Sequence, residues 1–207
     1  MQALIKKEYL VNKGSIIVDL IILIISPVLL FFSPNGLILG IILSCYQPIS
    51  NEANEKGNDT DIFMNSLPVT REKIVFSKYL FSLMTGAFYL SIVFLMSTFI
   101  PYHEVITIKE LMAGIAVVSI YLSVYYPLKY LVGQGFFVIS SLGFWVILAA
   151  LGYSIYNQGE SFDYWGMYNS YTTYTRLQVG ILSIIISFAV LTVSFRYSSR
   201  VYKKKDF

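Results

Sequence analysis

Apolar residues gather into long blocks along this 207-residue chain, with polar residues concentrated between them. Each block approaches the ~20 residues that an α-helix needs to cross about 30 Å of hydrocarbon. Lipid offers no hydrogen-bond partner to an exposed backbone, so we expect the blocks to be helices. The alternating ten-residue segments of a transmembrane β-barrel do not occur in the sequence. The pattern therefore predicts an all-α polytopic protein with six transmembrane helices, at Ser15–Phe32, Asn35–Ile49, Ile74–Ile100, Leu111–Leu128, Gly135–Tyr156 and Val179–Phe195.

The second block is short, but the turn sequence Pro34-Asn35-Gly36 lets it form a hairpin with the first. Composition supports the membrane interpretation, because only 13% of the residues are charged, against about 25% in a soluble domain. No segment has the composition of a separate soluble domain. We therefore expect residues 1–207 to form a single transmembrane domain.

Lys and Arg predict the orientation. With six spans and a cytosolic N-terminus, thirteen of these residues fall in the inner segments and two, Lys109 and Arg176, fall in the outer ones. This excess satisfies the positive-inside rule. Both termini and the Asn51–Lys78 loop should therefore face the cytosol of a bacterial cell membrane. The inner residues are Lys6, Lys7, Lys13, Lys56, Arg71, Lys73, Lys78, Lys129, Arg196, Arg200, Lys203, Lys204 and Lys205.

Residues 1–14 allow two interpretations. Their apolar side chains, Leu4, Ile5, Tyr9 and Leu10, alternate with lysines in a way that suits a short amphipathic helix on the inner headgroups. Alternatively, they are a basic tail that only sets the topology.

The polar segment 51–73 contains ordered signals. Asn58 or Asp59 can cap a helix start, and the negative charges of Asp59 and Asp61 suit its first turn. Pro68 should end that helix, and Thr70 can cap the next one. These signals predict a short interfacial helix, a break at the proline, and then the start of the third span. The alternative is a solvated connector with ordinary caps.

Two motifs stand out at the ends of predicted spans. The first, MNSLPVTREKIVFSKYL, contains Ser66, Leu67, Pro68, Val69, Arg71, Ile74, Val75, Lys78 and Tyr79. At these positions it resembles the loop between spans two and three in the membrane subunits of ABC-2-type transporters, the ABC-2-type permeases. The second, YYPLKYLVGQG, is similar to the family's turn between spans four and five, at Pro127, Leu128, Tyr130 and Gly133. The basic residue usual soon after that glycine is missing, because Gln134 and Gly135 follow. Six spans with cytosolic ends also agree with the family.

The resemblance implies a transport subunit that is not itself an enzyme. Two six-span subunits would form the pathway, and a partner ATPase would bind ATP and Mg²⁺, so this chain needs no cofactor. The chain has no G-x-x-x-x-G-K-(S/T) loop to hold phosphates, which agrees with that division. The helix at about Asp59–Ser66 would enter a cleft of the ATPase. The implied coupling residues are Asp59, Asp61, Ile62, Phe63, Met64, Ser66, Leu67, Pro68 and Arg71.

The likeness extends to membrane subunits of staphylococcal phenol-soluble-modulin exporters, which implies amphipathic peptide cargo and a role in virulence. Exporters of lantibiotics or drugs are near alternatives, and a secondary carrier or a non-transporting immunity or structural protein are more distant ones. The expected partners are a cytosolic ATP-binding subunit, a second permease copy or paralogue, membrane lipid and the exported peptide. Nucleic acid is not expected.

Other candidate chemistry is sparse. Tyr164, Trp165 and Tyr168 in the last outer loop suggest an outer gate, or an aromatic belt at headgroup level. Tyr121, Tyr125 and Tyr126 could line a path, although packing is the default explanation for them. Asp19 is a functional candidate as an intramembrane carboxylate, or it reaches headgroups or Lys13. Lone Cys45 and His103 predict neither a disulfide nor a metal site.

Overall fold

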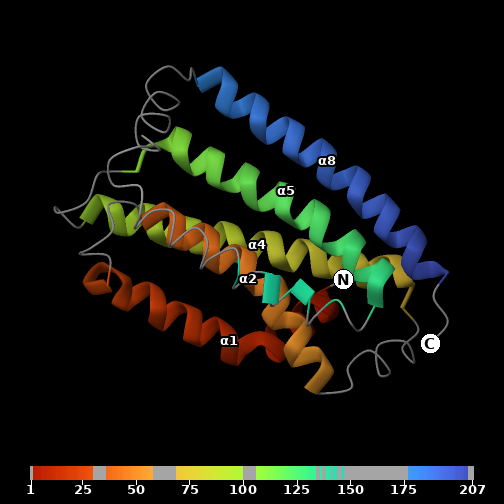
Figure 1. The fold of residues 1–207 in the computed structure, drawn as a ribbon. Helices are drawn as coiled ribbons and strands as arrows, with labels where there is room; N and C mark the ends of the chain where they lie inside the picture. The colour runs from red at the N-terminus through yellow and green to blue at the C-terminus, as the bar shows by residue number, and fades with distance from the viewer. Residues whose placement is uncertain are drawn as a thin grey trace.

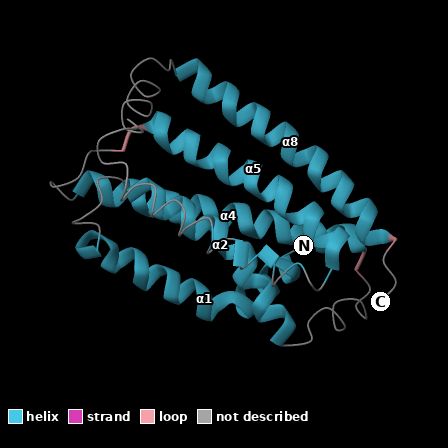
Figure 2. Cartoon of the chain, in the orientation of Figure 1, coloured by secondary structure: helices cyan, strands magenta, loops and turns pink. Residues whose placement is uncertain are grey.

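The computed structural model describes residues 2–29, 36–57, 69–99, 106–133 and 177–204, together with 136, 139–140, 142–143 and 146. Within these ranges the chain is all-α, as predicted (Figures 1 and 2). The long helices are α1 (Gln2–Leu29), α2 (Gly36–Gly57), α4 (Arg71–Phe99), α5 (Ile108–Val132) and α8 (Leu177–Lys203).

Three of these helices are long and apolar enough to cross a membrane. They are Arg71–Thr98, Ile108–Val132 and Gly180–Lys203, within α4, α5 and α8. They correspond to the predicted third, fourth and sixth spans. The structure of the described residues does not establish six spans, so that number stays a prediction.

The helices lie side by side in one bundle, with α4 at its centre (Figure 1). Helix α4 packs against α1, α2, α5 and α8, whereas α5 and α8 form one edge of the bundle and α1 and α2 the other. The beginnings of α1 and α4 meet the ends of α2 and α5, through contacts of Lys7, Glu55, Lys78 and Lys129. We call this the basic end of the bundle.

The basic end collects the helix termini in which the sequence placed the inner lysines and arginines. Lys203, at the end of α8, pairs with Glu72 in the first turn of α4. Lys109, which the sequence placed outside, lies in the first turn of α5 at the opposite end. The segregation of basic residues is therefore present in the fold, and the assignment of the basic end to the cytosol stays a prediction.

Helices α5 and α8 are parallel neighbours. A side chain added at Gly180 would meet Met112, Ser194 donates a 2.7 Å hydrogen bond to the Ser123 carbonyl, and the rings of Tyr130 and Tyr202 lie 5.1 Å apart. Residue numbers therefore rise in the same direction on both helices. The end of α5 at Val132 and the start of α8 at Leu177 therefore lie at opposite ends of the bundle. The predicted fifth span, Gly135–Tyr156, falls between these two residues in the sequence and lies mostly outside the described residues.

Most helices extend beyond the apolar blocks at the basic end. Helix α1 begins at Gln2, so residues 2–14 belong to one continuous helix whose placement on headgroups stays a prediction. Helix α2 continues to Gly57, into the segment that the sequence placed in the loop. Helix α5 passes through Pro127 to Val132, and α8 runs on to Lys203. Hydropathy detects apolar surface, whereas the extended parts of α1 and α2 carry buried polar side chains, among them Glu8, Asn12, Glu52 and Glu55.

Local signals define the start and end of α5. Thr107 and Glu110 form a capping box, with Thr107 N–H donating to Glu110 Oε2 over 2.7 Å. At the other end Gly133 has φ of 76°, a conformation that glycine adopts without the cost of a Cβ. The second sequence motif therefore ends a helix at its glycine, and its proline lies inside that helix.

The bundle has an apolar exterior and a partly polar interior. Large aliphatic side chains on α1, α5 and α8 are exposed, for example Ile24, Val124 and Val193. Hydroxyl side chains lie inside, as expected where small polar residues let membrane helices approach closely. The buried serines are Ser44, Ser77, Ser82, Ser97, Ser119, Ser123, Ser187, Ser194, Ser198 and Ser199.

Candidate functional site

The polar feature that joins most helices is a group of six charged side chains at the basic end, which we call the charge cluster. It consists of Lys7 and Glu8 from α1, Glu52 and Glu55 from α2, Lys78 from α4 and Lys129 from α5. All six side chains are less than one-fifth exposed. Charges leave water only when they are paired, and here three carboxylates face three ammonium groups.

Glu55 is the centre of the charge cluster. Its Oε1 accepts from Lys7 Nζ over 2.8 Å, its Oε2 accepts from Lys78 Nζ, and Lys129 Nζ lies 3.9 Å from the same oxygen. Burial raises the pKa of Glu55, but the positive charges of Lys78, Lys129 and Lys7 outweigh it and hold the pKa well below its usual range. Glu55 is therefore ionised at neutral pH, and its one side chain links α2 to α1, α4 and α5.

Glu8 is the member of the charge cluster that has a carboxylate oxygen without a hydrogen-bond partner among the described residues. Its Oε1 accepts from Lys7 Nζ over 3.1 Å, whereas its Oε2 is buried without a hydrogen-bond partner in the described structure. Burial raises the pKa of the Glu8 carboxyl, and the negative charge of Glu55 adds to that effect, while Lys78 and Lys7 oppose it. The surroundings of Glu8 therefore favour its protonated form more than those of Glu55 do.

Glu52 joins the charge cluster to the aromatic interior. Lys129 Nζ lies 3.7 Å from Glu52 Oε2, and the Tyr125 hydroxyl donates to the same oxygen over 3.1 Å. The Tyr125 hydroxyl also lies 3.3 Å from the Pro48 carbonyl. Pro48, which lies inside α2, thus contacts α5 through its carbonyl group.

A polar seam continues from the charge cluster between α1 and α2. Asn54 Nδ2 donates to Asn12 Oδ1 over 3.1 Å and to Ser15 Oγ over 2.8 Å, and Ser50 donates to Ser15 over 2.9 Å. Nearer the centre of α2, Gln47 donates to Asn51 over 2.8 Å. These bonds satisfy polar groups that would otherwise be exposed to an apolar environment.

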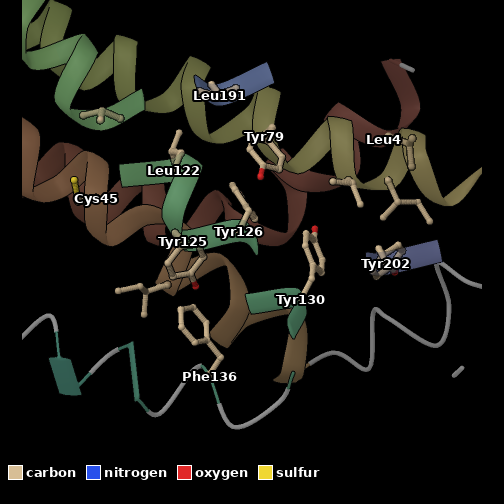
Figure 3. Close-up of a cluster of buried hydrophobic side chains, with 14 of the residues drawn as sticks. Leu4, Cys45, Tyr79, Leu122, Tyr125, Tyr126, Tyr130, Phe136, Leu191 and Tyr202 are labelled. Atoms are coloured by element: carbon tan, nitrogen blue, oxygen red, sulfur yellow. The ribbon is translucent and has the colours of Figure 1, made fainter. Parts of the chain in front are cut away.

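Figure 3 shows a group of buried tyrosines contributed by α4, α5 and α8. Hydrogen bonds of Tyr125 to Glu52 and of Tyr126 to the Lys78 carbonyl place this group next to the charge cluster. The rings of Tyr79 and Tyr126 are 4.3 Å apart, and the Tyr126 hydroxyl bonds Ser82 over 2.6 Å. The Tyr79 hydroxyl bonds Ser194 over 2.8 Å and Ser198 over 2.9 Å. Tyr125 and Tyr126 are buried in the core, so of the two interpretations of these residues the structure supports packing.

A second link at the basic end connects α4 with α8. Arg71 Nη1 donates to the Lys203 carbonyl over 3.0 Å, and Lys203 Nζ lies 2.9 Å from Glu72 Oε2. Thr70 precedes α4, and its carbonyl accepts from Lys73 N–H over 2.9 Å, as expected at the start of a helix. These contacts are exposed, so each should stabilise the fold by less than ~1 kcal/mol.

Of the predicted coupling residues, the structure describes Arg71, which lies in the first turn of α4. The others, and the predicted outer gate, lie outside the described residues. They are Asp59, Asp61, Ile62, Phe63, Met64, Ser66, Leu67 and Pro68, and Tyr164, Trp165 and Tyr168.

Asp19 has a different partner from the ones expected. It is buried, and its Oδ2 accepts a 2.7 Å hydrogen bond from Tyr89 on α4, instead of reaching toward headgroups or Lys13. Tyr89 lies eleven residues beyond Lys78, or about 16 Å along the helix axis. Asp19 is therefore well inside the bundle and separate from the charge cluster.

The sequence analysis placed Glu52 and Glu55 in the cytosolic loop and Lys78 at the start of a span, and it did not predict that they form a buried cluster. One signal was available. Glu8, Asn12, Ser15 and Asp19 are spaced by four, three and four residues, which puts them on one helical face. A polar stripe with that period on an otherwise apolar helix indicates a face buried against polar partners.

The polar side chains of this region form salt bridges and hydroxyl hydrogen bonds. Among the described residues no group of His, Cys, Asp and Glu could hold a metal ion. Cys45 is a buried free thiol.

The family model described as ABC-2 family transporter protein matches residues 3–203, nearly the whole chain. The chain therefore belongs to the ABC-2 transporter family and is a multi-pass membrane protein of the permease type, a type that lacks an ATPase of its own. Neither a search of curated proteins nor a search of solved structures found a match.

Proposed function

We propose that this chain is the permease subunit of an ABC exporter. It pairs with a second permease, either a copy of itself or a paralogue, and a cytosolic ATP-binding subunit supplies the energy. The observation that carries the proposal is the family match over residues 3–203. The parallel arrangement of α5 and α8 supports it, because a return crossing between them is what a six-span permease requires.

We propose that the segment 59–66 receives the movement of the ATPase. It lies in the stretch of chain between the end of α2 at Gly57 and the start of α4 at Arg71. Because α4 contacts each of the other long helices, a displacement of its first turn reaches the whole bundle. Arg71 and Glu72 extend that path to α8 through Lys203.

We propose amphipathic peptides, of the phenol-soluble-modulin kind, as the cargo. The support is the likeness of the chain to subunits of such exporters and the aromatic residues Tyr164, Trp165 and Tyr168 in the last predicted outer loop. An amphipathic peptide partitions into the membrane interface, where Tyr and Trp side chains also concentrate.

Co-purification with the ATP-binding subunit tests the coupling assignment. The segment Asp59–Ser66 is replaced by a Gly/Ser stretch of equal length, and binding of the ATPase and cargo-stimulated hydrolysis are measured in proteoliposomes. We expect both to fall to background. Lys109→Gln, at the opposite end of α5, serves as the control and should retain both. An unchanged complex with unchanged cargo-stimulated hydrolysis would rule out the coupling role.

The cargo assignment needs a separate measurement. Uptake of a labelled amphipathic helical peptide into inside-out vesicles is compared with that of a peptide of the same composition whose apolar residues are scrambled around the helix. We expect ATP-dependent uptake of the first peptide alone. Uptake driven by a proton gradient without ATP would favour a secondary carrier.

A further inference from the structure

Glu55 and Lys78 flank the proposed coupling segment. Glu55 lies two residues before the end of α2, and Lys78 lies seven residues after the first residue of α4. Glu55 Oε2 accepts a hydrogen bond from Lys78 Nζ, and both side chains are less than one-tenth exposed. The end of α2 and the beginning of α4 are therefore joined by a buried ion pair.

The same carboxylate also contacts the helices on either side. Lys7 Nζ donates to Glu55 Oε1 over 2.8 Å, and Lys129 Nζ lies 3.9 Å from Glu55 Oε2. Lys7 belongs to the second turn of α1 and Lys129 to the last turn of α5. Glu55 thus forms ion pairs with ammonium groups from three other helices, which no other carboxylate in the described part of the chain equals.

We propose that Glu55 is a positioning residue that makes the basic ends of α1, α2, α4 and α5 move as one body when the coupling segment is displaced. This inference rests on the proposed function, because it concerns how the movement of that segment is passed on. A link of this kind has to resist separation of the helices, and ion pairs buried in a low-dielectric surrounding do so more strongly than exposed ones. The exposed Lys203–Glu72 pair is screened by water and contributes much less.

Stability and coupling respond differently to changes at this pair. Glu55→Gln alone leaves three lysines facing two carboxylates, and Lys78→Met alone leaves the opposite imbalance. A buried charge that loses its partner destabilises a protein, whereas replacing both partners by apolar residues of similar volume is often neutral or stabilising. In Glu55→Met/Lys78→Met two lysines again face two carboxylates. That double variant therefore restores the charge balance without restoring the link.

The experiment measures thermal unfolding, co-purification of the ATP-binding subunit and cargo-stimulated ATP hydrolysis on each variant of the assembled complex. We expect Glu55→Met/Lys78→Met to unfold close to the wild-type temperature and to retain the ATPase. Its cargo-stimulated hydrolysis should fall about tenfold, within the range of interaction energies seen between contacting residues. Glu55→Asp, which keeps the charge and shortens the side chain, should bind the ATPase normally and lose part of the stimulation.

A purely structural role makes another prediction. In that case cargo-stimulated hydrolysis changes in proportion to stability. The double variant would then have both the stability and the hydrolysis of the wild type, and Glu55→Asp would lose hydrolysis only in proportion to its loss of stability. Either of these results would overturn the proposal. If the wild-type complex itself shows no cargo-stimulated hydrolysis, the proposed function fails, and that outcome is distinct from a failure at Glu55. Glu110→Gln, in the capping box at the opposite end of α5, controls for the removal of a carboxylate and should retain the stimulation.

Discussion

The hydroxyl of Tyr89 on α4 donates a 2.7 Å hydrogen bond to the carboxylate of Asp19 on α1. Apolar residues surround this contact, including Leu23, Leu43 and Val93. The pair therefore joins two helices through a polar bond in a part of the bundle that is otherwise held by packing.

Removal of the Tyr89 hydroxyl should destabilise the protein. Tyr89→Phe leaves the Asp19 carboxylate without this donor, which should cost about 1–3 kcal/mol. In Tyr89→Phe/Asp19→Leu both polar partners are gone, and most of that loss should be recovered. Thermal unfolding of the purified protein in detergent measures both variants. Equal destabilisation by the single and the double variant would contradict a penalty for the unpaired carboxylate.

Glu8 should make stability depend on pH. Its pKa is raised in the folded protein, chiefly by burial and by Glu55. A raised pKa means that the stabilising contribution is fully present below the pKa of the unfolded state, about 4.3, and is lost as pH rises through the folded value. Glu8→Gln, which resembles the protonated form, should therefore gain stability relative to wild type as pH rises through that window. Unfolding midpoints from pH 4 to 8 test this, and a constant difference across the range would contradict it.

Gly86 should not tolerate a larger side chain. A Cβ at Gly86 would lie 3.2 Å from Val118 Cγ1 on α5 and 3.4 Å from Ser44 Cβ on α2. Gly86→Val should push α4 away from both helices and cost about 1–3 kcal/mol. Gly14→Ala is the matched control, because a Cβ there meets nothing within 4 Å and alanine favours the helix by up to ~1 kcal/mol. The two substitutions should shift the unfolding temperature in opposite directions.

Tyr79→Phe should loosen α8. The Tyr79 hydroxyl bonds both Ser194 and Ser198, and Ser194 in turn donates to the Ser123 carbonyl, so one hydroxyl links α4, α5 and α8. Interhelical hydrogen bonds in membrane proteins average about 0.6 kcal/mol, so the loss of two should cost ~1 kcal/mol. Tyr197→Phe, at an exposed position of α8, is the control and should have little effect. Protease sensitivity of α8 and the unfolding temperature report the difference.

Arg71→Ala should separate stability from transport. Its hydrogen bond to the Lys203 carbonyl is exposed, so the unfolding free energy should change by less than about 1 kcal/mol. If Arg71 lies on the path from the ATPase to α8, as we propose, cargo-stimulated hydrolysis should fall much more than stability does. Matched measurements of unfolding and hydrolysis on the same preparation test this. A loss of hydrolysis no larger than the loss of stability would remove Arg71 from the path.

The helical class and three of the spans could be predicted because they follow from local composition. Ile74–Ile100, Leu111–Leu128 and Val179–Phe195 are apolar enough to identify α4, α5 and α8. The charge cluster could not be predicted in the same way, because its bonds join residues far apart in sequence. Lys78 and Glu55 are separated by 23 residues, and Lys7 and Glu55 by 48. Taken singly, each of these side chains is indistinguishable from a solvated charge at the end of a helix.

The end of α2 shows how contacts between residues far apart in sequence affect helix boundaries. Hydropathy ends the second apolar block at Ile49, yet the helix continues because Asn51, Glu52 and Glu55 are buried. Asn54, between them, bonds Asn12 and Ser15 on α1. Tertiary partners therefore extend a helix that local signals would end. The polar stripe on α1 was the one readable sign of those partners.

The parallel course of α5 and α8 has an electrostatic consequence. Both helices point their carbonyl ends at the same face of the membrane, and each such end behaves as about half a negative charge. Lys129 lies in the last turn of α5, and Arg200 and Lys203 lie in the last turn of α8. Three of the lysines and arginines from which the orientation is predicted thus lie where they neutralise the dipoles of two adjacent helices. Their removal would disturb the folded bundle even in a protein that had already inserted correctly.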